Sequence, residues 1–277
     1  MNRSSKILVA GHTGLVGSAM KRRLEEEGYA NIAAASWPAI DLTDQQATDG
    51  LLARERPEVV FLCAAKVGGI LANSTLPADF IYQNVMIAAN VIHASFRHGA
   101  RKLLNLGSSC IYPRLAPQPL REEYLLTGEL EPTNEPYAIA KIAAIKLCSA
   151  YNRQHGTNFI SVMPTNLYGP GDNFDLETSH VLPAMIRRFH EAKENGAPAV
   201  TLWGTGTPRR EFLYVDDLAA ACVHLMAHHD ARALGEFVNI GTGTDLTIAE
   251  LAGIVARVVR YRGEIRWDHT KPDGTPQ

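Results

Sequence analysis

Three side chains in the middle of the chain have the types and the spacing needed for proton transfer to a carbonyl group. Tyr137 and Lys141 are four residues apart, so on a helix they lie on one face, one turn from each other. The ammonium is expected to favour the phenolate and lower the tyrosine pKa toward neutrality, which makes Tyr137 a general acid or base. Ser108 precedes this pair, at the end of an apolar segment, and can hydrogen-bond the same substrate oxygen. Because Tyr-x-x-x-Lys also occurs by chance on solvated helices, its weight depends on the surrounding elements.

A loop near the N-terminus is typical of phosphate binding. The first apolar segment ends in a G-x-x-G-x-x-G arrangement that a helical pattern follows. Such a loop permits a tight turn and a close backbone approach to a pyrophosphate, and the helix offers free N–H groups and the positive end of its dipole. Three spaced glycines alone are a weak signal, but their place after the first strand favours a dinucleotide site. The expected contact residues are Gly11, His12, Thr13, Gly14, Leu15, Val16 and Gly17.

The end of the second strand indicates which dinucleotide such a site binds. An acidic residue there contacts an unphosphorylated ribose, whereas a basic residue accompanies a 2′-phosphate. The segment from Ala35 to Pro38 has neither, and offers Ser36 and Trp37 instead. We expect Ser36, Asp41 and Leu42 to contact the adenosine end, although a plain loop carboxylate is an equal interpretation of Asp41.

The elements that must position these residues follow a βαβ pattern. Runs rich in Val, Ile and Leu alternate with longer amphipathic stretches, and the runs are continuously apolar, as in a parallel sheet covered by helices on both faces. The pattern predicts an α/β fold, a Rossmann-like doubly wound parallel sheet with a smaller α/β substrate-binding domain. We place the dinucleotide-binding domain at residues 1–168, completed by about 213–243, and the substrate-binding domain at 169–212 and 244–277. Strands are expected at 6–10, 58–65, 102–107, 158–164 and 237–240, and helices at 19–28, 78–98, 137–155, 180–195, 215–229 and 247–260.

Composition and charge argue against several classes of function. The 277 residues have a formal net charge of −2, so no overall field attracts a nucleic acid. The longest apolar runs are far shorter than a membrane span, and the N-terminal one is too short for a signal-peptide core. The 4 cysteines lie far apart without a C-x-x-C pair, which argues against disulfides or zinc and agrees with a reducing compartment. We therefore expect a cytoplasmic protein with a small-molecule partner and without metal, nucleic acid or membrane.

Longer strings of the sequence resemble one family, the extended short-chain dehydrogenases/reductases. The resemblance covers nearly the whole chain, and its strings are far more specific than the short motifs above. It implies 3,5-epimerisation and NADPH-dependent 4-reduction of GDP-4-keto-6-deoxy-D-mannose to GDP-L-fucose, by a homodimer that pairs helices of the cofactor domain, here residues 78–98 and 137–155. Family members continue past the last of these strings. The strings are AAKVGGI (64–70), ADFIYQN (78–84), LGSSCIYP (106–113), EPTNEPYAIAKIA (131–143), VMPTNLYGPGDNF (162–174), SHVLPA (179–184), RRFHEA (187–192), WGTGTPRREFLYVDD (203–217) and KPDGTP (271–276).

The resemblance also implies a role for each catalytic residue. A ketone at C4 makes the protons on C3 and C5 acidic, so epimerisation needs a base on one face and an acid on the other, which the resemblance assigns to Cys110 and His180. A nearby cation is expected to promote the Cys110 thiolate. In the reduction, a nicotinamide delivers hydride to C4, Tyr137 protonates the alkoxide, Ser108 polarises the carbonyl, and Lys141 holds the nicotinamide ribose. If the resemblance is set aside, Cys110 is interpreted as a small buried apolar residue, and His180, at a helix start, as a surface residue.

The remaining implied contacts concern the cofactor and a nucleotide-sugar. The resemblance implies NADP(H) as the cofactor. NAD(H) is the alternative, because Thr13 and Trp37 stand where a member of the family has arginines. The implied substrate contacts, with arginines for the pyrophosphate and an indole as a stacking surface, are Arg188, Trp203, Arg210 and Asp273. The further cofactor contacts are Leu106, Gly107, Lys141, Pro164, Thr165, Asn166, Leu167 and His180.

Other functions stay open at this point. A sugar-nucleotide 4-epimerase or 4,6-dehydratase shares the glycine loop and the Tyr-x-x-x-Lys pair, but a dehydratase is expected to carry a carboxylate pair where this chain has Ser109 and Cys110. An epimerase/reductase of a related GDP-4-keto sugar, dideoxy or heptose, fits the same residues. A non-catalytic dinucleotide sensor would keep the fold but would not need a tuned phenol.

Overall fold

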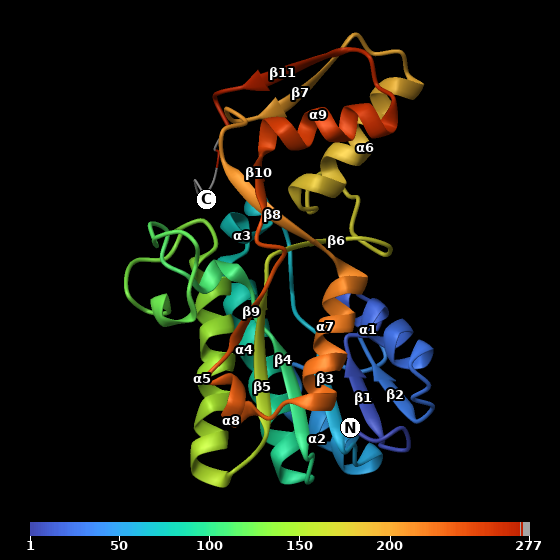
Figure 1. Ribbon diagram of the computed structural model, residues 1–277, viewed down its shortest axis with the longest axis vertical. Coiled ribbons are helices and arrows are strands. Elements are labelled where there is room, and N and C mark those ends of the chain that lie inside the picture. Colours follow the sequence, from blue (N-terminus) through green and yellow to red (C-terminus); the bar gives the residue numbers. More distant parts are fainter. Residues whose placement is uncertain (272, 274–277) are drawn as a thin grey trace.

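A parallel sheet of six strands forms the centre of the larger part of the molecule, the lower part in Figure 1. The computed structural model describes residues 1–271 and 273, so the string KPDGTP lies outside the described residues except for Lys271 and Asp273. The strand order β2-β1-β3-β4-β5-β9, with every neighbouring pair parallel, confirms the predicted doubly wound sheet. The strands are β1 (Ile7–Ala10), β2 (Ile32–Ala35), β3 (Val59–Leu62), β4 (Lys102–Leu106), β5 (Phe159–Pro164) and β9 (Val238–Ile240).

The side chains of β1 explain why both faces of this sheet are covered. All four residues of β1 are fully buried, and they alternate between two cores. Ile7 and Val9 belong to a cluster that includes side chains of α1 and α7, whereas Leu8 and Ala10 belong to one that includes side chains of α2, α4 and α5. A strand that packs on both faces has apolar residues at every position, and the sequence of β1 shows this pattern. The helices are α1 (Leu15–Glu26), α2 (Gln45–Glu55), α4 (Pro77–Arg97), α5 (Glu135–His155) and α7 (Val215–His228), with short α3 (Ile70–Thr75) and α8 (Ala231–Leu234).

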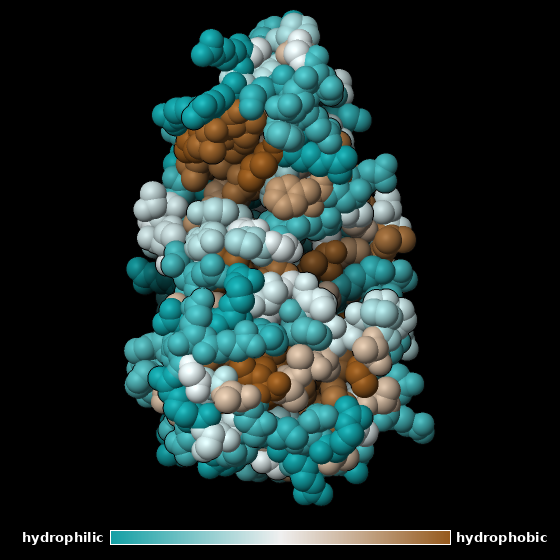
Figure 2. Space-filling view, turned by 90° about the vertical axis from the view of Figure 1, so that its right-hand side faces the viewer, coloured by the Kyte–Doolittle hydropathy of each residue, from teal (hydrophilic) through white to brown (hydrophobic). Residues whose placement is uncertain are grey.

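The upper part of the molecule in Figure 1 has its own apolar core. Helices α6 (Val181–Glu194) and α9 (Ile248–Val259) pack together and against the parallel pair β7 (Ala199–Trp203) and β11 (Glu264–Asp268). On the face shown in Figure 2, apolar side chains gather on this upper part, and α9 leaves Val258 75% exposed. A three-stranded sheet, β10-β8-β6, lies between this core and the large sheet; its strands are β6 (Asn166–Tyr168), β8 (Arg209–Tyr214) and β10 (Asp245–Thr247).

The chain passes between the two parts at three places, and each crossing is short. One residue, Thr165, separates β5 from β6; β8 leads directly into α7; and a short turn joins β9 to β10. Residues at these crossings therefore lie between the large sheet and the upper part.

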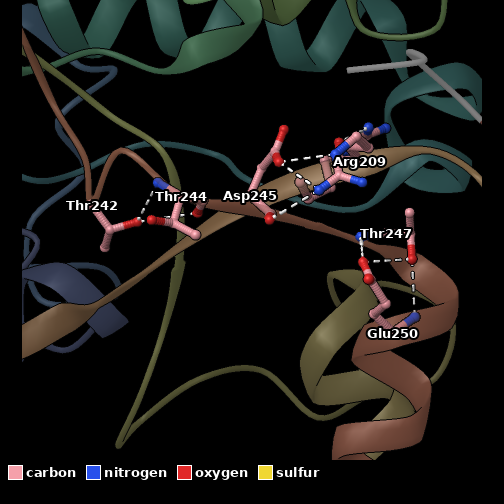
Figure 3. A network of polar contacts seen from close by, with 7 residues as sticks. Arg209, Thr242, Thr244, Asp245, Thr247 and Glu250 are labelled. Carbon is pink, nitrogen blue, oxygen red and sulfur yellow. Dashed lines mark hydrogen bonds and ion pairs between the residues drawn. The ribbon is translucent and has the colours of Figure 1, made fainter.

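Helix ends differ from the expected ends for local reasons. The predicted helix 247–260 is α9, from Ile248 to Val259, because Thr247 and Arg260 are its caps. The Thr247 hydroxyl accepts a hydrogen bond from the Glu250 N–H at 3.1 Å, and the Glu250 carboxylate accepts one from the Thr247 N–H at 2.7 Å, which is the capping box in Figure 3. Helix α1 begins at Leu15, earlier than predicted, directly after Gly14. Among the described residues, no helix is both long and apolar enough to cross a membrane.

Candidate active site

Ser108, Cys110, Tyr137 and Lys141 come together beyond the carboxyl end of β4. Ser108 has an extended backbone and precedes a 3-10 turn, η1 (Ser109–Ile111), that carries Cys110. Tyr137 and Lys141 lie one turn apart near the start of α5, and the Lys141 Nζ is 5.6 Å from the centre of the Tyr137 ring. Ser108 lies close enough to Tyr137 and Cys110 to act on both, lowering the pKa of each side chain. We call these four residues the Ser–Cys–Tyr–Lys cluster.

The ammonium group of the cluster is buried. Lys141 is only 8% exposed, and its Nζ donates a hydrogen bond to the Leu106 carbonyl at 2.7 Å. Because burial penalises the charged form, the pKa of Lys141 falls to about 8, although Cys110 and Cys63 oppose this shift. The lysine thus loses its charge just above neutral pH.

The expected lowering of the Tyr137 pKa is wrong. Burial raises the pKa of Tyr137 well above its usual range, the nearby Cys110 raises it further, and the Ser108 side chain only partly opposes the rise. The direction of this pKa shift could not be predicted from the sequence, because the sequence does not show that the ring is enclosed. Phe80, for example, packs edge-on to the Tyr137 ring, with centroids 6.2 Å apart. A phenol with a raised pKa stays protonated at neutral pH, which suits a proton donor.

Lys141 gives a pH dependence to any reaction that needs its charge. We expect the rate of carbonyl reduction to be constant around neutral pH and to fall about tenfold per pH unit above a pH of about 8, as Lys141 loses its proton. Initial rates of nicotinamide oxidation across this range test it, with deuterated NADPH used to verify that hydride transfer limits the rate. A rate that stays constant well above the lysine pKa would contradict the assignment.

The expectation of a promoted thiolate at Cys110 is also wrong for this structure. Burial raises the pKa of Cys110 to about 11, although Ser108 and Lys141 both act to lower it. Cys110 is therefore a protonated thiol at neutral pH. Burial raises the thiol pKa of Cys63 and Cys148 to about 12 and of Cys222 as well, in agreement with the interpretation of these three as small apolar side chains.

His180 lies on a separate segment, at the N-cap of α6. It is exposed, and protein atoms around the ring lower its pKa, while the Asp172 carboxylate acts in the opposite direction. No contact recorded for the described residues joins His180 to the Ser–Cys–Tyr–Lys cluster. The loop before it is held toward the large sheet, since the Gly69 N–H donates to the Thr178 carbonyl at 3.0 Å. Asp172 was not singled out from the sequence, although it lies in a string that the resemblance quotes.

The glycine loop fits a dinucleotide pyrophosphate. Gly11 has a φ of +88°, and a Cβ on Gly17 would lie 2.0 Å from the Gly11 carbonyl oxygen, so neither tolerates a side chain. Gly14 caps α1 without any side-chain hydrogen bond, which leaves the helix N-terminus to an anion. The His12 Nδ1 is buried and has no hydrogen-bond partner among the described residues, as expected for an atom that a ligand would satisfy.

At the adenosine end, the predicted residues have different surroundings. Ser36 is 8% exposed and Trp37 is 71% exposed, directly after β2. The Asp41 carboxylate accepts hydrogen bonds from the N–H and the hydroxyl of Thr43, at 2.9 and 2.7 Å, so it is engaged within its own turn. Leu42 is buried in the core under α2 and α4. These contacts support the interpretation of Asp41 as a plain loop carboxylate. Asp41 could contact the cofactor only if its turn with Thr43 opened.

At the nicotinamide end, residues 164–167 pass from β5 into β6 beside the large sheet. The Thr165 N–H donates to the Ile240 carbonyl at 3.2 Å, and the Thr165 hydroxyl is buried without a partner among the described residues. The Asn166 amide donates to the Glu211 carbonyl at 3.0 Å, and Leu167 packs against the core under α1 and α7.

The upper part gathers cations around an exposed indole. Trp203, at the end of β7, has the Arg188 guanidinium 6.0 Å and the Lys271 ammonium 5.4 Å from its ring centre. Asp273 accepts hydrogen bonds from the N–H and the hydroxyl of Thr205, at 2.7 and 2.9 Å, so it anchors the turn after β7. Lys271 also belongs to this group. It was not predicted as a site residue and stands only within the string KPDGTP.

The neighbouring Arg209 and Arg210 on β8 differ in their partners. Arg209 is ion-paired with Asp245 on β10 at 2.8 Å and also donates to the Asp245 carbonyl, as Figure 3 shows. Arg210 donates to the Arg209 carbonyl at 2.7 Å, and burial lowers its pKa, while Asp273 and Glu131 partly offset this effect. No ion pair within 4.0 Å is recorded for Arg210 in the described part of the chain, so of the two it is better placed to hold an anion.

Comparison with known proteins places this chain in a family. A sequence model of the NAD dependent epimerase/dehydratase family matches residues 7–241. GDP-L-fucose synthase 1 of Arabidopsis thaliana is 59% identical over 276 residues, covering 100% of this chain and 84% of that protein. GDP-L-fucose synthase of Escherichia coli is 55% identical over 278 residues, covering 98% of this chain and 87% of that protein.

A solved structure shares the fold and was determined with a dinucleotide. The GDP-mannoheptose C4 reductase of Campylobacter jejuni with NADP bound is 39% identical and has a TM-score of 0.89; the match covers 97% of this chain and 89% of that one.

Proposed function

Since this chain belongs to the NAD dependent epimerase/dehydratase family, we propose that it is an NAD(P)-dependent enzyme that epimerises GDP-4-keto-6-deoxy-D-mannose at C3 and C5 and reduces it at C4 to GDP-L-fucose. The observation that carries the proposal is the Ser–Cys–Tyr–Lys cluster beside the glycine-loop sheet. Its tyrosine, lysine and serine serve a carbonyl reduction, and its thiol adds a group for proton transfer at the neighbouring carbons.

Each side chain has a separate task in this reaction. Cys110 and His180 move protons at C3 and C5, which the C4 ketone makes acidic; Cys110 begins as a thiol and must lose its proton to act as the base. NADPH, when bound, supplies the hydride for C4. Ser108 then hydrogen-bonds the C4 oxygen, Tyr137 gives it a proton, and the Lys141 ammonium stabilises the negative charge that develops there.

A direct assay tests the proposed function. Purified protein is incubated with GDP-4-keto-6-deoxymannose and NADPH, the loss of nicotinamide absorbance is followed, and the sugar product is identified by NMR. Formation of GDP-L-fucose supports the proposal, and no turnover by a folded protein that binds NADPH contradicts it. Turnover with retained configuration at C3 and C5 would instead indicate a simple C4 reductase, the activity named for the Campylobacter jejuni relative.

We expect the preference for NADPH over NADH to be weaker than in a site that has a cation for the 2′-phosphate. Thr13 and Trp37 provide no charge, so NADPH is held through hydroxyls such as that of Ser36 and through nearby N–H groups. We expect kcat/KM to favour NADPH over NADH by less than about a thousandfold, the ratio that corresponds to roughly 4 kcal/mol. Kinetics with both dinucleotides measure the ratio, and a larger preference would contradict the expectation.

We assign residues 169–212 and 244–277 to substrate binding, with Arg188, Arg210 and the Trp203 indole around the GDP moiety. Because Arg209 is paired with Asp245, Arg210→Ala should weaken GDP binding by roughly ten- to a hundredfold, while Arg209→Ala, its matched control, should change it by less than about threefold. Calorimetric titration with GDP gives both constants. Equal losses in the two variants would show that this division between neighbouring arginines is wrong.

We propose further that the enzyme is a cytoplasmic homodimer that pairs α4 and α5 with the same helices of a second copy. The support is that these two helices pack together and leave Tyr82 and Ile139 62% and 39% exposed. A monomer in sedimentation at micromolar concentration would contradict the dimer.

A further inference from the structure

An exposed tryptophan lies at the rim of the proposed dinucleotide site. Trp37 is the second residue after β2, and it is 71% exposed, more than Trp203 at 44%. Large aromatic side chains usually bury most of their surface, so an indole this exposed is available for a ligand.

The topology fixes which part of a dinucleotide lies near Trp37. The glycine loop after β1 receives the pyrophosphate, and β2 lies on one side of β1 while β3, β4 and β5 lie on the other. The Ser–Cys–Tyr–Lys cluster follows β4, so the nicotinamide points that way and the adenosine points to β2. The loop and the end of β2 are directly joined, because the Gly11 N–H donates to the Ala35 carbonyl at 2.6 Å.

The residues around the adenosine end provide little positive charge to bind a 2′-phosphate. Residues 11–44, all described, contain three Lys or Arg residues, and each is ion-paired: Lys21 with Glu25 at 2.6 Å, Arg22 with Asp216 at 2.6 Å, and Arg23 with Glu27 at 2.7 Å. The nearby Asp41 carboxylate is held by Thr43 within its turn, and so is not presented to a ribose 2′-hydroxyl either. Neither charge pattern that usually selects the dinucleotide is present.

We propose that the Trp37 indole is the stacking surface for the adenine ring of the dinucleotide, and that this contact, rather than a charge at the ribose, anchors the adenosine end. The proposal rests on the proposed cofactor. Stacking involves the base and not the 2′-position, so it strengthens the binding of NADP(H) and NAD(H) by the same factor.

The test uses two probes without a nicotinamide, ADP-ribose and its 2′-phosphate, with the intrinsic fluorescence of the protein. The chain has 3 tryptophans, so variants assign the signal. Both probes should quench the fluorescence of the wild type and of Trp203→Phe, the control that removes the other exposed indole, but not that of Trp37→Phe. In calorimetry, Trp37→Ala should weaken both probes by a similar factor, roughly tenfold or more. Trp37→Arg should tighten only the 2′-phosphate form.

The outcomes separate this proposal from the proposed function. Unchanged affinity in Trp37→Ala, or quenching that persists in Trp37→Phe, would overturn the stacking role while leaving the dinucleotide site intact. A loss confined to the 2′-phosphate probe would also overturn it, since Trp37 would then act at the ribose. If the folded wild type binds neither probe, the dinucleotide site itself is wrong.

Discussion

Tyr137→Phe should lower the rate of 4-reduction by roughly 10³-fold and leave proton exchange at C3 and C5 largely intact. The variant removes one hydroxyl, so the ring still packs against Phe80 and the dinucleotide should still bind. What is lost is the proton donor to the oxygen that becomes an alkoxide as hydride arrives at C4. Because the Tyr137 pKa is raised, this donor is fully protonated in the wild type at neutral pH.

The measurement for Tyr137→Phe separates the two half-reactions. The variant is incubated with the 4-keto substrate in heavy water, and deuterium at C3 and C5 is followed by NMR or mass spectrometry, while nicotinamide absorbance reports the reduction. Binding of NADPH, measured by calorimetry, is the control for an intact site. If exchange disappears together with reduction while NADPH still binds, one shared acid/base serves both steps and the proposed division of tasks fails.

Cys110→Ser should give the complementary result, with deuterium exchange at C3 and C5 reduced by roughly 10²-fold or more. A serine hydroxyl is a far weaker acid than a thiol, even one whose pKa is about 11, and so forms the conjugate base much less readily. The shape of the site is nearly kept, because oxygen replaces sulfur. Cys222→Ala is the matched control, since it removes a buried thiol from α7 and should leave exchange unchanged.

One result would contradict the role of Cys110, and a second would call for a further variant. Exchange at the wild-type rate in Cys110→Ser would show that the thiol is a structural side chain. Loss of NADPH binding in the same variant would show that the substitution disturbs the cofactor site, in which case Cys110→Ala with the same titration decides whether the thiol has a chemical role.

The sequence predicted the composition of the Ser–Cys–Tyr–Lys cluster because its members occupy fixed places in a pattern. Ser108 and Cys110 follow a buried strand, Tyr137 and Lys141 begin a helix, and in a parallel α/β sheet these ends meet at one edge. The sheet itself was predictable because its strands are apolar throughout.

What the sequence could not give is how strongly each group is enclosed. The pKa of Tyr137 moves up instead of down because burial, together with Cys110, outweighs the opposing effect of Ser108, while the Lys141 ammonium is bonded to the Leu106 carbonyl. Likewise, the Arg209 pairing with Asp245 joins residues on different strands, β8 and β10, and only the antiparallel register of these strands brings them close. Such pairings depend on the tertiary fold rather than on spacing along the chain.

The burial of Lys141 also affects the stability of the folded chain. Its pKa is about 8 in the fold against 10.5 ordinarily, so between these values the unfolded chain binds the extra proton and folding becomes more favourable as the pH rises. At neutral pH, where the group is charged in both states, the fold is therefore less stable by about 3 kcal/mol, at about 1.4 kcal/mol per pKa unit, than it would be with a neutral group there. An ammonium that helps a reduction thus opposes the folding of its own domain, a cost that the buried apolar side chains on both faces of the sheet must offset.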